Sequence, residues 1–258
     1  MERSILKTVV LYLSIQLGFI LATYCTGSVS VMTIASYIAI TFIVHAGLAA
    51  FLLRFKEDFF NLSTSLPLER INLANRITLL RISTLPSMAL LLQHNEVFQI
   101  RFVLPALLVL LFLTDSFDGQ IARRGKQITR IGQMLDSISD YSLLGVISIV
   151  YYSNQILPGW FFTLILFRLF LQALGMFVFI LVGKPLPMRS TWGGKITIAT
   201  TMTLYVAEVL KFYTPTSAAR VFTVVEYVAG AIIVACSFEK AAIFFRQGKK
   251  VSDDRKEP

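Results

Sequence analysis

Long blocks of apolar residues alternate with short polar segments along the whole chain. A membrane helix needs roughly 20 apolar residues, and fewer where protein surrounds it. Eight blocks qualify, at about residues 6–24, 29–53, 77–92, 102–121, 133–152, 159–182, 195–210 and 221–245. The strict alternation typical of a membrane β-barrel is absent. The pattern therefore predicts an all-α integral membrane protein, because helices satisfy their own backbone polar groups in lipid.

The composition and the charges agree with this interpretation and add an orientation. The chain is 55% hydrophobic and 15% charged, and its net charge is +9. A basic excess in a membrane protein reflects Lys and Arg on the cytoplasmic side, so we expect no nucleic-acid partner. With a cytoplasmic N-terminus, only Arg101, Lys211 and Arg220 fall on the outer side. This predicts a multi-pass protein of the inner or cell membrane, with both ends in the cytoplasm.

The spacing of the blocks also predicts how the chain is divided. The first two blocks hold no acidic residue, so residues 1–56 are expected to be two additional helices in front of a six-span core at 75–246. Residues 57–74 mix aromatic, leucine and charged side chains, which predicts an amphipathic segment on the membrane surface. A plain connecting loop is the alternative. Residues 247–258 are polar and predicted to form a disordered cytoplasmic tail.

Four aspartates begin at the end of a strongly apolar run, 102–114, where unpaired carboxylates are unfavourable. Asp115 and Asp118 are three residues apart, and Asp136 and Asp140 are four apart, so each pair shares one face of a helix. Four neighbouring carboxylates need compensation, and hard divalent cations prefer oxygen ligands. Metal pairs held by carboxylates commonly serve displacement at phosphorus. A membrane prenyltransferase and a cation transporter remain alternatives.

The residues also match a known pattern, Asp-x₂-Asp-Gly-x₂-Ala-Arg-x₈-Gly-x₃-Asp-x₃-Asp. It is formed here by Asp115, Asp118, Gly119, Ala122, Arg123, Gly132, Asp136 and Asp140. This pattern resembles the signature of the CDP-alcohol phosphotransferase family, and the resemblance extends over the six-span core. It implies that the four aspartates bind two ions, Mg²⁺ or Mn²⁺, and that Asp140 is also the general base. It further implies contacts to the CDP group from Asn75, Thr78, Arg81, Gly119, Ala122, Arg123, Thr129 and Gly132, and association as a homodimer.

The implied activity is a transferase of phospholipid biosynthesis. It would move phosphatidyl from CDP-diacylglycerol to a small polar alcohol and release CMP at a site facing the cytoplasm. Candidate ligands for a phosphorylated acceptor are Lys126, Arg168, Arg189 and Lys195. Arg168 lies inside an apolar block, where an arginine usually faces the bundle interior and has an anionic partner. A structural ion pair with a motif aspartate is the alternative for Arg168.

The acceptor itself is predicted from a shorter resemblance. The segment "STWGGKIT" resembles the Gly-Lys-x-Lys-Thr stretch of phosphatidylglycerophosphate synthases, which favours glycerol-3-phosphate. Leu169 and Ile196 stand where those enzymes have an acid and a second lysine. Phosphatidylinositol-phosphate synthesis and phosphatidylserine synthesis therefore stay open, as does a choline or ethanolamine phosphotransferase that uses diacylglycerol.

Other ionisable residues are predicted to be structural. His45 lies alone in an apolar block, without a catalytic partner nearby in the sequence. Glu208 and Glu226 lie toward the outer ends of the last two blocks, where they can reach water or pair with Lys211 and Arg220.

Overall fold

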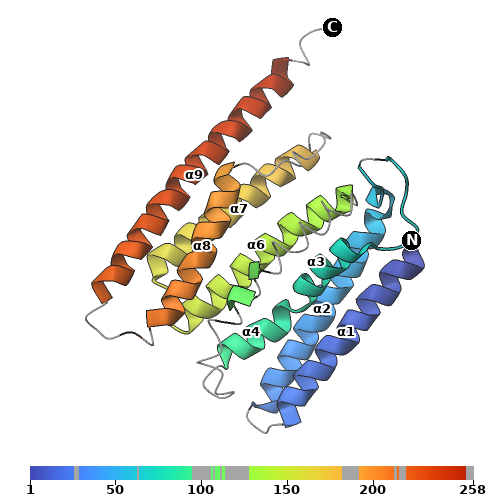
Figure 1. Cartoon of the computed structure of the whole chain (residues 1–258), viewed down its shortest axis with the longest axis horizontal. Coiled ribbons are helices and arrows are strands. Elements are labelled where there is room, and N and C mark those ends of the chain that lie inside the picture. Colours follow the sequence, from blue (N-terminus) through green and yellow to red (C-terminus); the bar gives the residue numbers. More distant parts are fainter. Residues whose placement is uncertain are drawn as a thin grey trace. The chain divides into compact units, whose positions relative to one another are not determined.

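The structure is a computed structural model, and its described part is helical apart from short connections (Figure 1). It describes residues 1–25, 29–62, 64–94, 106, 108–110, 112–113, 128–181, 192–211, 214 and 219–253. The elements are α1 (Glu2–Cys25), α2 (Val31–Arg54), the 3₁₀ turn η1 (Lys56–Asp58), α3 (Leu73–Ser83), α4 (Leu85–Gln93), α6 (Arg130–Ser153), α7 (Gly159–Leu181), α8 (Trp192–Leu210) and α9 (Ala219–Asp253). The prediction of an all-α protein is confirmed for these residues.

Within this part of the chain, four helical segments are long and apolar enough to cross a membrane. They are Glu2–Cys25, Val31–Arg54, Arg130–Ser153 and Arg220–Ala242. The segment Gly159–Gly175 is also apolar but shorter. The expected fourth span, 102–121, lies mostly outside the described residues. The protein is therefore an integral membrane protein, and the count of eight spans stays a prediction.

The third expected span, 77–92, is wrong as a single helix. It consists of α3 and α4, which meet at Thr84. Pro86 lies at the start of α4 and has no backbone N–H, and its ring would collide with the carbonyl four residues earlier in a continuous helix. The hydroxyl of Thr84 donates to the carbonyl of Arg81 at 2.8 Å and so satisfies one group at the end of α3. Proline thus breaks a segment that is uniformly apolar.

The chain divides into two compact units, Met1–Val150 and Tyr151–Pro258, and the division falls within α6. In the first unit, α1 and α2 form an antiparallel hairpin (Figure 1). Glu2 at the start of α1 pairs with Lys56 just after α2, at 2.6 Å. The charged ends of both helices are therefore on the same side, as two successive membrane spans require.

Polar side chains fasten this hairpin to α3 and α4. The imidazole of His45 contacts the hydroxyl of Ser83 through Nε2 at 2.7 Å and the carbonyl of Thr41 through Nδ1 at 2.8 Å. The hydroxyl of Ser87 donates to the amide oxygen of Gln16 at 2.5 Å. All of these side chains are buried. His45 is a structural residue, as its isolation in the sequence predicts.

The segment between the hairpin and α3 is mostly irregular. After η1, Phe60 forms an isolated bridge with Pro67, and Asn61 forms another with Thr129 at the start of α6. Phe59 is buried, so the segment packs onto the first unit through at least one aromatic ring. Its expected position on the membrane surface stays a prediction.

The second unit consists of the end of α6 with α7, α8 and α9. The hydroxyl of Tyr151 donates to the carbonyl of Tyr205 at 3.3 Å, and Trp160 stacks on Tyr227 with a centroid separation of 5.3 Å. Lys211 pairs with Glu208 at 2.6 Å and also with Glu226. The predicted pairing of these two acids is therefore confirmed, with Lys211 as the shared partner.

The last helix is longer than the sequence pattern predicts. α9 continues to Asp253, past the expected start of the disordered tail at residue 247. The first residues of that tail contain no proline, and polar residues such as Lys and Gln are good helix formers. A helix that begins in the apolar block can therefore continue through them.

Candidate active site

One face of α3 supplies three polar side chains to the first unit. Asn75, Thr78 and Arg81 are spaced three residues apart, so they lie on the same side of the helix, and all three are buried. Asn72 caps the start of α3, because its side chain accepts a hydrogen bond from the backbone N–H of Asn75 at 3.0 Å. The cap fixes where α3 begins and thereby which residues form this face.

The first contact between α3 and α6 is a cluster of Asn75, Thr129 and Gly132. The amide of Asn75 donates to the hydroxyl oxygen of Thr129 at 3.0 Å. The same oxygen accepts from the backbone N–H of Gly132 at 3.0 Å and so caps the start of α6. A Cβ on Gly132 would lie 2.5 Å from Oδ1 of Asn75 and 2.8 Å from Oγ1 of Thr129. The close approach of these groups therefore requires glycine at position 132.

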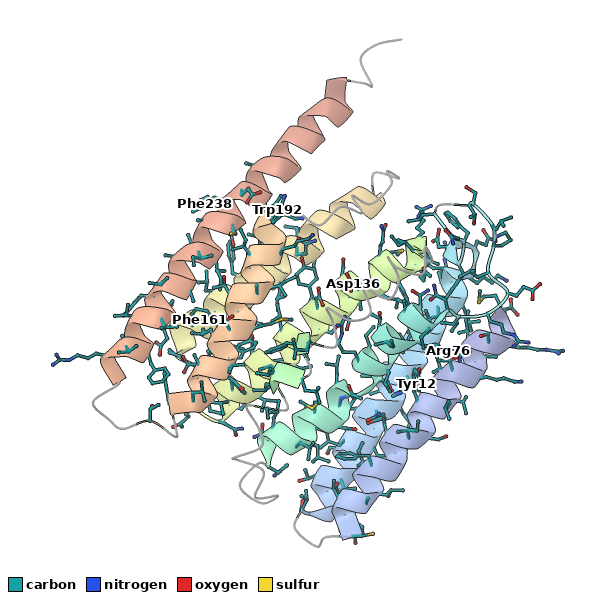
Figure 2. All side chains as sticks on the ribbon, in the orientation of Figure 1. Tyr12, Arg76, Asp136, Phe161, Trp192 and Phe238 are labelled. Atoms are coloured by element: carbon teal, nitrogen blue, oxygen red, sulfur yellow. The ribbon has the colours of Figure 1, made fainter. Side chains whose placement is uncertain are left out.

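The second contact brings a buried cation to the motif acids of α6. Arg81 donates from Nε to the hydroxyl of Ser139 at 2.6 Å. Its Nη2 lies 3.5 Å from Oδ1 of Asp140 and 3.7 Å from Oδ1 of Asp136. The side chain of Arg81 is 2% exposed, that of Asp140 12% and that of Asp136 54%. One carboxylate is thus nearly enclosed, while its neighbour one turn earlier, labelled in Figure 2, is open to the surroundings.

The two contacts follow the same order along both helices. Asn75 meets residues 129–132, and six residues later Arg81 meets residues 136–140. α3 and α6 therefore advance in the same direction past each other, with polar groups between them. A buried arginine is stable there because two carboxylates offset its charge. The arrangement holds Asp140 in place from one side and leaves Asp136 accessible.

The aspartates of α6 fit a divalent metal ion in their chemistry. Oδ1 of Asp136 and Oδ1 of Asp140 both lie within 4 Å of one nitrogen of Arg81, so the two oxygens converge. Carboxylate oxygens are the donors that Mg²⁺ and Mn²⁺ prefer. Among the described residues, no group of three or more His, Cys, Asp or Glu side chains could hold a metal ion. A complete ion site would therefore need further ligands.

The remaining predicted ligands divide into two groups. Asp115, Asp118, Gly119, Ala122, Arg123, Lys126 and Arg189 lie outside the described residues. Arg168 on α7 and Lys195 on α8 belong to the second unit. Arg168 is buried, whereas Lys195 is exposed and lies 5.7 Å from the ring centroid of Trp192. The cluster of four aspartates stays a prediction.

One residue of this site was missed by the sequence reasoning. Ser139 directly precedes Asp140 and accepts a hydrogen bond of 2.6 Å from Nε of Arg81. Its place directly before a motif aspartate was the only feature of the sequence that pointed to it. The spacing of polar residues on α3 and α6 identifies two faces, but it does not indicate which residues of the two faces meet.

The fold and these contacts define an integral membrane protein with an acidic polar site between two of its helices. Comparison with known sequences identifies its family. The description of the matching family is CDP-alcohol phosphatidyltransferase, and the match covers residues 71–238. The chain belongs to the CDP-alcohol phosphatidyltransferase family. α1 and α2 precede the matched segment, whereas α3 and α6 lie within it.

The chain is also similar to curated proteins from several bacteria. It is 39% identical over 79 residues to a CDP-diacylglycerol--glycerol-3-phosphate 3-phosphatidyltransferase from Rickettsia bellii (strain RML369-C), covering 31% of this chain and 43% of that protein. It is 35% identical over 131 residues to a probable phosphatidylglycerophosphate synthase from Mycobacterium tuberculosis (strain CDC 1551 / Oshkosh), and the match covers 48% of this chain and 59% of that protein. It is 31% identical over 145 residues to a CDP-diacylglycerol--glycerol-3-phosphate 3-phosphatidyltransferase from Pectobacterium atrosepticum, and the match covers 53% of this chain and 76% of that protein.

The match spans less than half the length of the first of these relatives. No solved structure matches the chain.

Proposed function

We propose that this protein transfers the phosphatidyl group of CDP-diacylglycerol to glycerol-3-phosphate and releases CMP. The observation that carries the proposal is the pair of carboxylates, Asp136 and Asp140, that converges on Arg81 beside the cluster of Asn75, Thr129 and Gly132. A phosphoryl-transfer site needs an acidic centre next to a nucleotide-binding surface, and the polar groups between α3 and α6 would supply both. The names of the relatives support this donor and this acceptor.

The proposed reaction is a displacement at phosphorus. The acceptor hydroxyl oxygen attacks the β-phosphorus of the CDP-lipid and forms a new phosphorus–oxygen bond. The bond from that phosphorus to the bridging oxygen breaks, and CMP leaves with its electron pair. Asp140 takes the proton of the attacking hydroxyl. Bound divalent ions would offset the negative charge of the diphosphate and of CMP.

The residues of the first unit would then have separate roles. Asp136 and Asp140 would supply oxygen ligands to Mg²⁺ or Mn²⁺, together with Asp115 and Asp118. Arg81 would hold Asp140 in position through its own contacts to Ser139 and the carboxylate. Asn75, Thr78, Thr129 and Gly132 would line the CDP group, with Gly119, Ala122 and Arg123. The absence of a Cβ at Gly132 would let Asn75 and Thr129 reach the start of α6 and so shape this surface.

Support for a phosphorylated acceptor comes from the second unit. Arg168 and Lys240 are both buried and interact electrostatically. Gln172, one turn after Arg168, is also buried, and within the described part of the chain its Oε1 finds no hydrogen-bond partner. Two buried positive charges near one acidic side chain, Glu239, leave an excess of positive charge that favours an anion, and the amide oxygen can accept a hydrogen bond from a hydroxyl group. Glycerol-3-phosphate provides both groups.

This assignment predicts the kinetics of the Arg168→Gln variant. A charged hydrogen bond contributes about 1.5–3 kcal/mol, so we expect the KM for glycerol-3-phosphate to rise by about 10- to 100-fold. The KM for CDP-diacylglycerol should stay within about twofold, because Arg168 makes no contact to the donor in this proposal. Lys195→Gln, which removes an exposed charge, should change either KM far less. An unchanged KM together with a lower melting temperature would instead identify Arg168 as a structural ion-pair residue.

The activity is tested by CMP release from the purified protein with CDP-diacylglycerol and Mg²⁺ or Mn²⁺. Glycerol-3-phosphate, inositol phosphate, inositol and serine are added one at a time. We expect release with glycerol-3-phosphate, and its loss after EDTA, with recovery when the ion is restored. Release with another acceptor would keep the reaction class and replace the acceptor. No release with any of them would redirect the test to CDP-choline and CDP-ethanolamine with diacylglycerol.

The remaining expectations complete the proposal. The site would face the cytoplasm, because the charged ends of α1 and α2 carry Arg3, Lys7, Arg54 and Lys56. Residues 1–56 would form an additional pair of spans before a catalytic core at 75–246, with 57–74 at the membrane surface. The bilayer would deliver the lipid substrate, and two chains would associate as a homodimer.

A further inference from the structure

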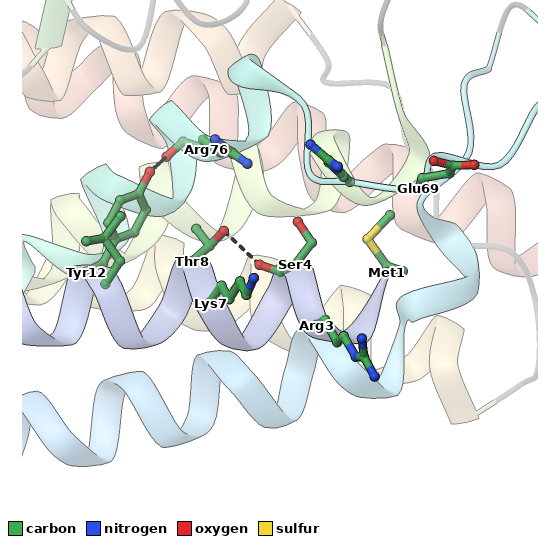
Figure 3. A pocket seen from close by; sticks show the side chains of 10 residues that line it. Met1, Arg3, Ser4, Lys7, Thr8, Tyr12, Glu69 and Arg76 are labelled. Carbon is green, nitrogen blue, oxygen red and sulfur yellow. Dashed lines mark hydrogen bonds between the residues drawn. The ribbon is translucent and has the colours of Figure 1, made fainter.

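A basic cavity opens between the start of α1 and the segment that leads into α3. Its volume is about 450 Å³, and Arg3, Lys7, Arg70 and Arg76 line it with Glu69. Four basic side chains against one acidic side chain leave an excess of three positive charges. Figure 3 shows the cavity from close by, with α1 along one side of it.

Hydrogen bonds hold the two sides of this cavity together. The hydroxyl of Tyr12 donates to the carbonyl of Arg76 at 3.1 Å (Figure 3). The hydroxyl oxygen of Ser4 accepts from the backbone N–H of Ile71 at 3.2 Å. Arg3, Lys7 and Arg76 extend from backbones that these contacts fix, so their charges gather around one space. The position of the cavity thus depends on the packing of α1 against α3.

An apolar row continues from the cavity along α1. Leu11 lines the cavity, and it is followed at intervals of four residues by Ile15 and Phe19. The three side chains are 56%, 50% and 38% exposed on a helix that is long and apolar enough to cross a membrane. Residues four apart lie above one another on a helix, so Lys7 and these three side chains form one row from charged to apolar.

We propose that this cavity binds the phosphate of an anionic phospholipid, whose acyl chains lie along the row of Leu11, Ile15 and Phe19. Charge complementarity selects an anion, and the apolar row selects a lipid over a free phosphate. Three of the four basic side chains, Arg3, Lys7 and Arg70, precede the family match that begins at residue 71. The site is thus formed largely by α1 and by the segment just before the matched residues. It shares no side chain with Asp136 and Asp140 and does not depend on the proposed activity.

The test is lipid binding by the purified full-length protein, measured by native mass spectrometry. Dioleoyl-phosphatidylglycerol is compared with dioleoyl-phosphatidylcholine, which has the same chains and no net charge. Each basic residue near an anionic lipid contributes about 1 kcal/mol, so R3Q/K7Q should weaken the affinity for phosphatidylglycerol about 30-fold. R70Q alone should weaken it about fivefold, which keeps the test available should the double variant fold poorly.

A matched control removes the same two charges elsewhere. Arg54 ends α2 and Lys56 begins η1 directly after it, and neither lines the cavity. R54Q/K56Q should retain the affinity of the wild type for phosphatidylglycerol, and D140N should do so as well. Phosphatidylcholine should bind weakly and equally to every variant. Millimolar inorganic phosphate should leave the bound lipid in place.

Three results would overturn the proposal. Equal binding of phosphatidylglycerol by R3Q/K7Q, R70Q and the wild type would exclude the cavity as its site. An equal loss in R54Q/K56Q would show a general effect of net charge. Displacement of the lipid by inorganic phosphate would identify a site for small anions. None of these outcomes bears on CMP release, so failure here and failure of the proposed activity are distinguishable.

Discussion

The Asp140→Asn variant is expected to release CMP about 100- to 10,000-fold more slowly than the wild type, since general-base catalysis contributes about 10²–10⁴. Asparagine has nearly the same shape as aspartate, so the side chain keeps its place beside Arg81 and Ser139. It carries no charge and cannot take the proton of the acceptor hydroxyl. The chemical step should therefore fail while the site remains assembled. Single-turnover measurements of CMP release separate this step from product release.

The same substitution should also lower stability. Arg81 is buried, and its Nη2 lies 3.5 Å from the carboxylate of Asp140, which offsets its charge together with the more exposed Asp136. Loss of one partner of a buried charge weakens the fold by about 1–3 kcal/mol. Thermal unfolding in detergent, followed by circular dichroism, measures this effect and shows whether the variant is folded.

Asp58→Asn is the matched control for Asp140→Asn. Asp58 pairs with Arg130 at 3.4 Å near the start of α6, so the substitution also removes a carboxylate from an arginine in the first unit. This pair is more exposed to solvent than that of Arg81, and exposed ion pairs contribute about 0–1 kcal/mol. Turnover should stay within a few-fold of the wild type. A D140N enzyme that approaches wild-type turnover would remove Asp140 from the role of base.

Gly132→Ala is expected to reduce kcat/KM for CDP-diacylglycerol by about 10- to 100-fold, because displacing a binding group by about 1 Å can have an effect of this size. The new Cβ would lie 2.5 Å from Oδ1 of Asn75 and 2.8 Å from Oγ1 of Thr129. Both atoms end short side chains that hydrogen-bond each other, so neither can withdraw without losing that contact. Alanine would therefore separate α3 from α6 at the proposed nucleotide surface. Steady-state CMP release at varied CDP-diacylglycerol measures the loss.

Helix propensity alone predicts that Gly132→Ala stabilises the protein, which is opposite to the effect expected from the close contacts. Alanine stabilises a helix interior by about 1 kcal/mol over glycine, whereas overpacking destabilises by about 1–3 kcal/mol. Gly47→Ala on α2 separates the two effects, because nothing lies within 4 Å of a Cβ at that position. It should leave activity unchanged and stability equal or slightly higher. Equal activity of Gly132→Ala and Gly47→Ala would show that the close approach at Gly132 does not matter for the reaction.

The length of the apolar blocks predicted most of the long helices well, because a helix that crosses a membrane needs a run of roughly 20 apolar residues. The expected span at 159–182 corresponds to α7 at Gly159–Leu181, and the one at 133–152 corresponds to α6 at Arg130–Ser153. The block at 77–92 was misleading because average hydropathy does not register one proline. Pro86 divides it into two short helices.

Motif spacing predicted the faces of the site but not their partners. The four-residue interval placed Asp136 and Asp140 on one side of a helix, and both indeed lie near one nitrogen of Arg81. The contact of Arg81 with Ser139 depends on how α3 and α6 pack, which local spacing does not determine. The same holds for His45 and Ser83, which are far apart in the sequence and meet only after the hairpin packs onto α3.

The polar contacts of the N-terminal hairpin have a consequence for how the protein is made. α1 and α2 are synthesised before α3 and α4, yet Gln16 and His45 find their partners Ser87 and Ser83 on those later helices. An amide or imidazole that faces lipid without its partner is unfavourable. The hairpin therefore reaches its stable state in the bilayer only once the chain has been synthesised and inserted through α4. We therefore expect α1 to α4 to become stable in the bilayer together, although the match to the family begins only at residue 71.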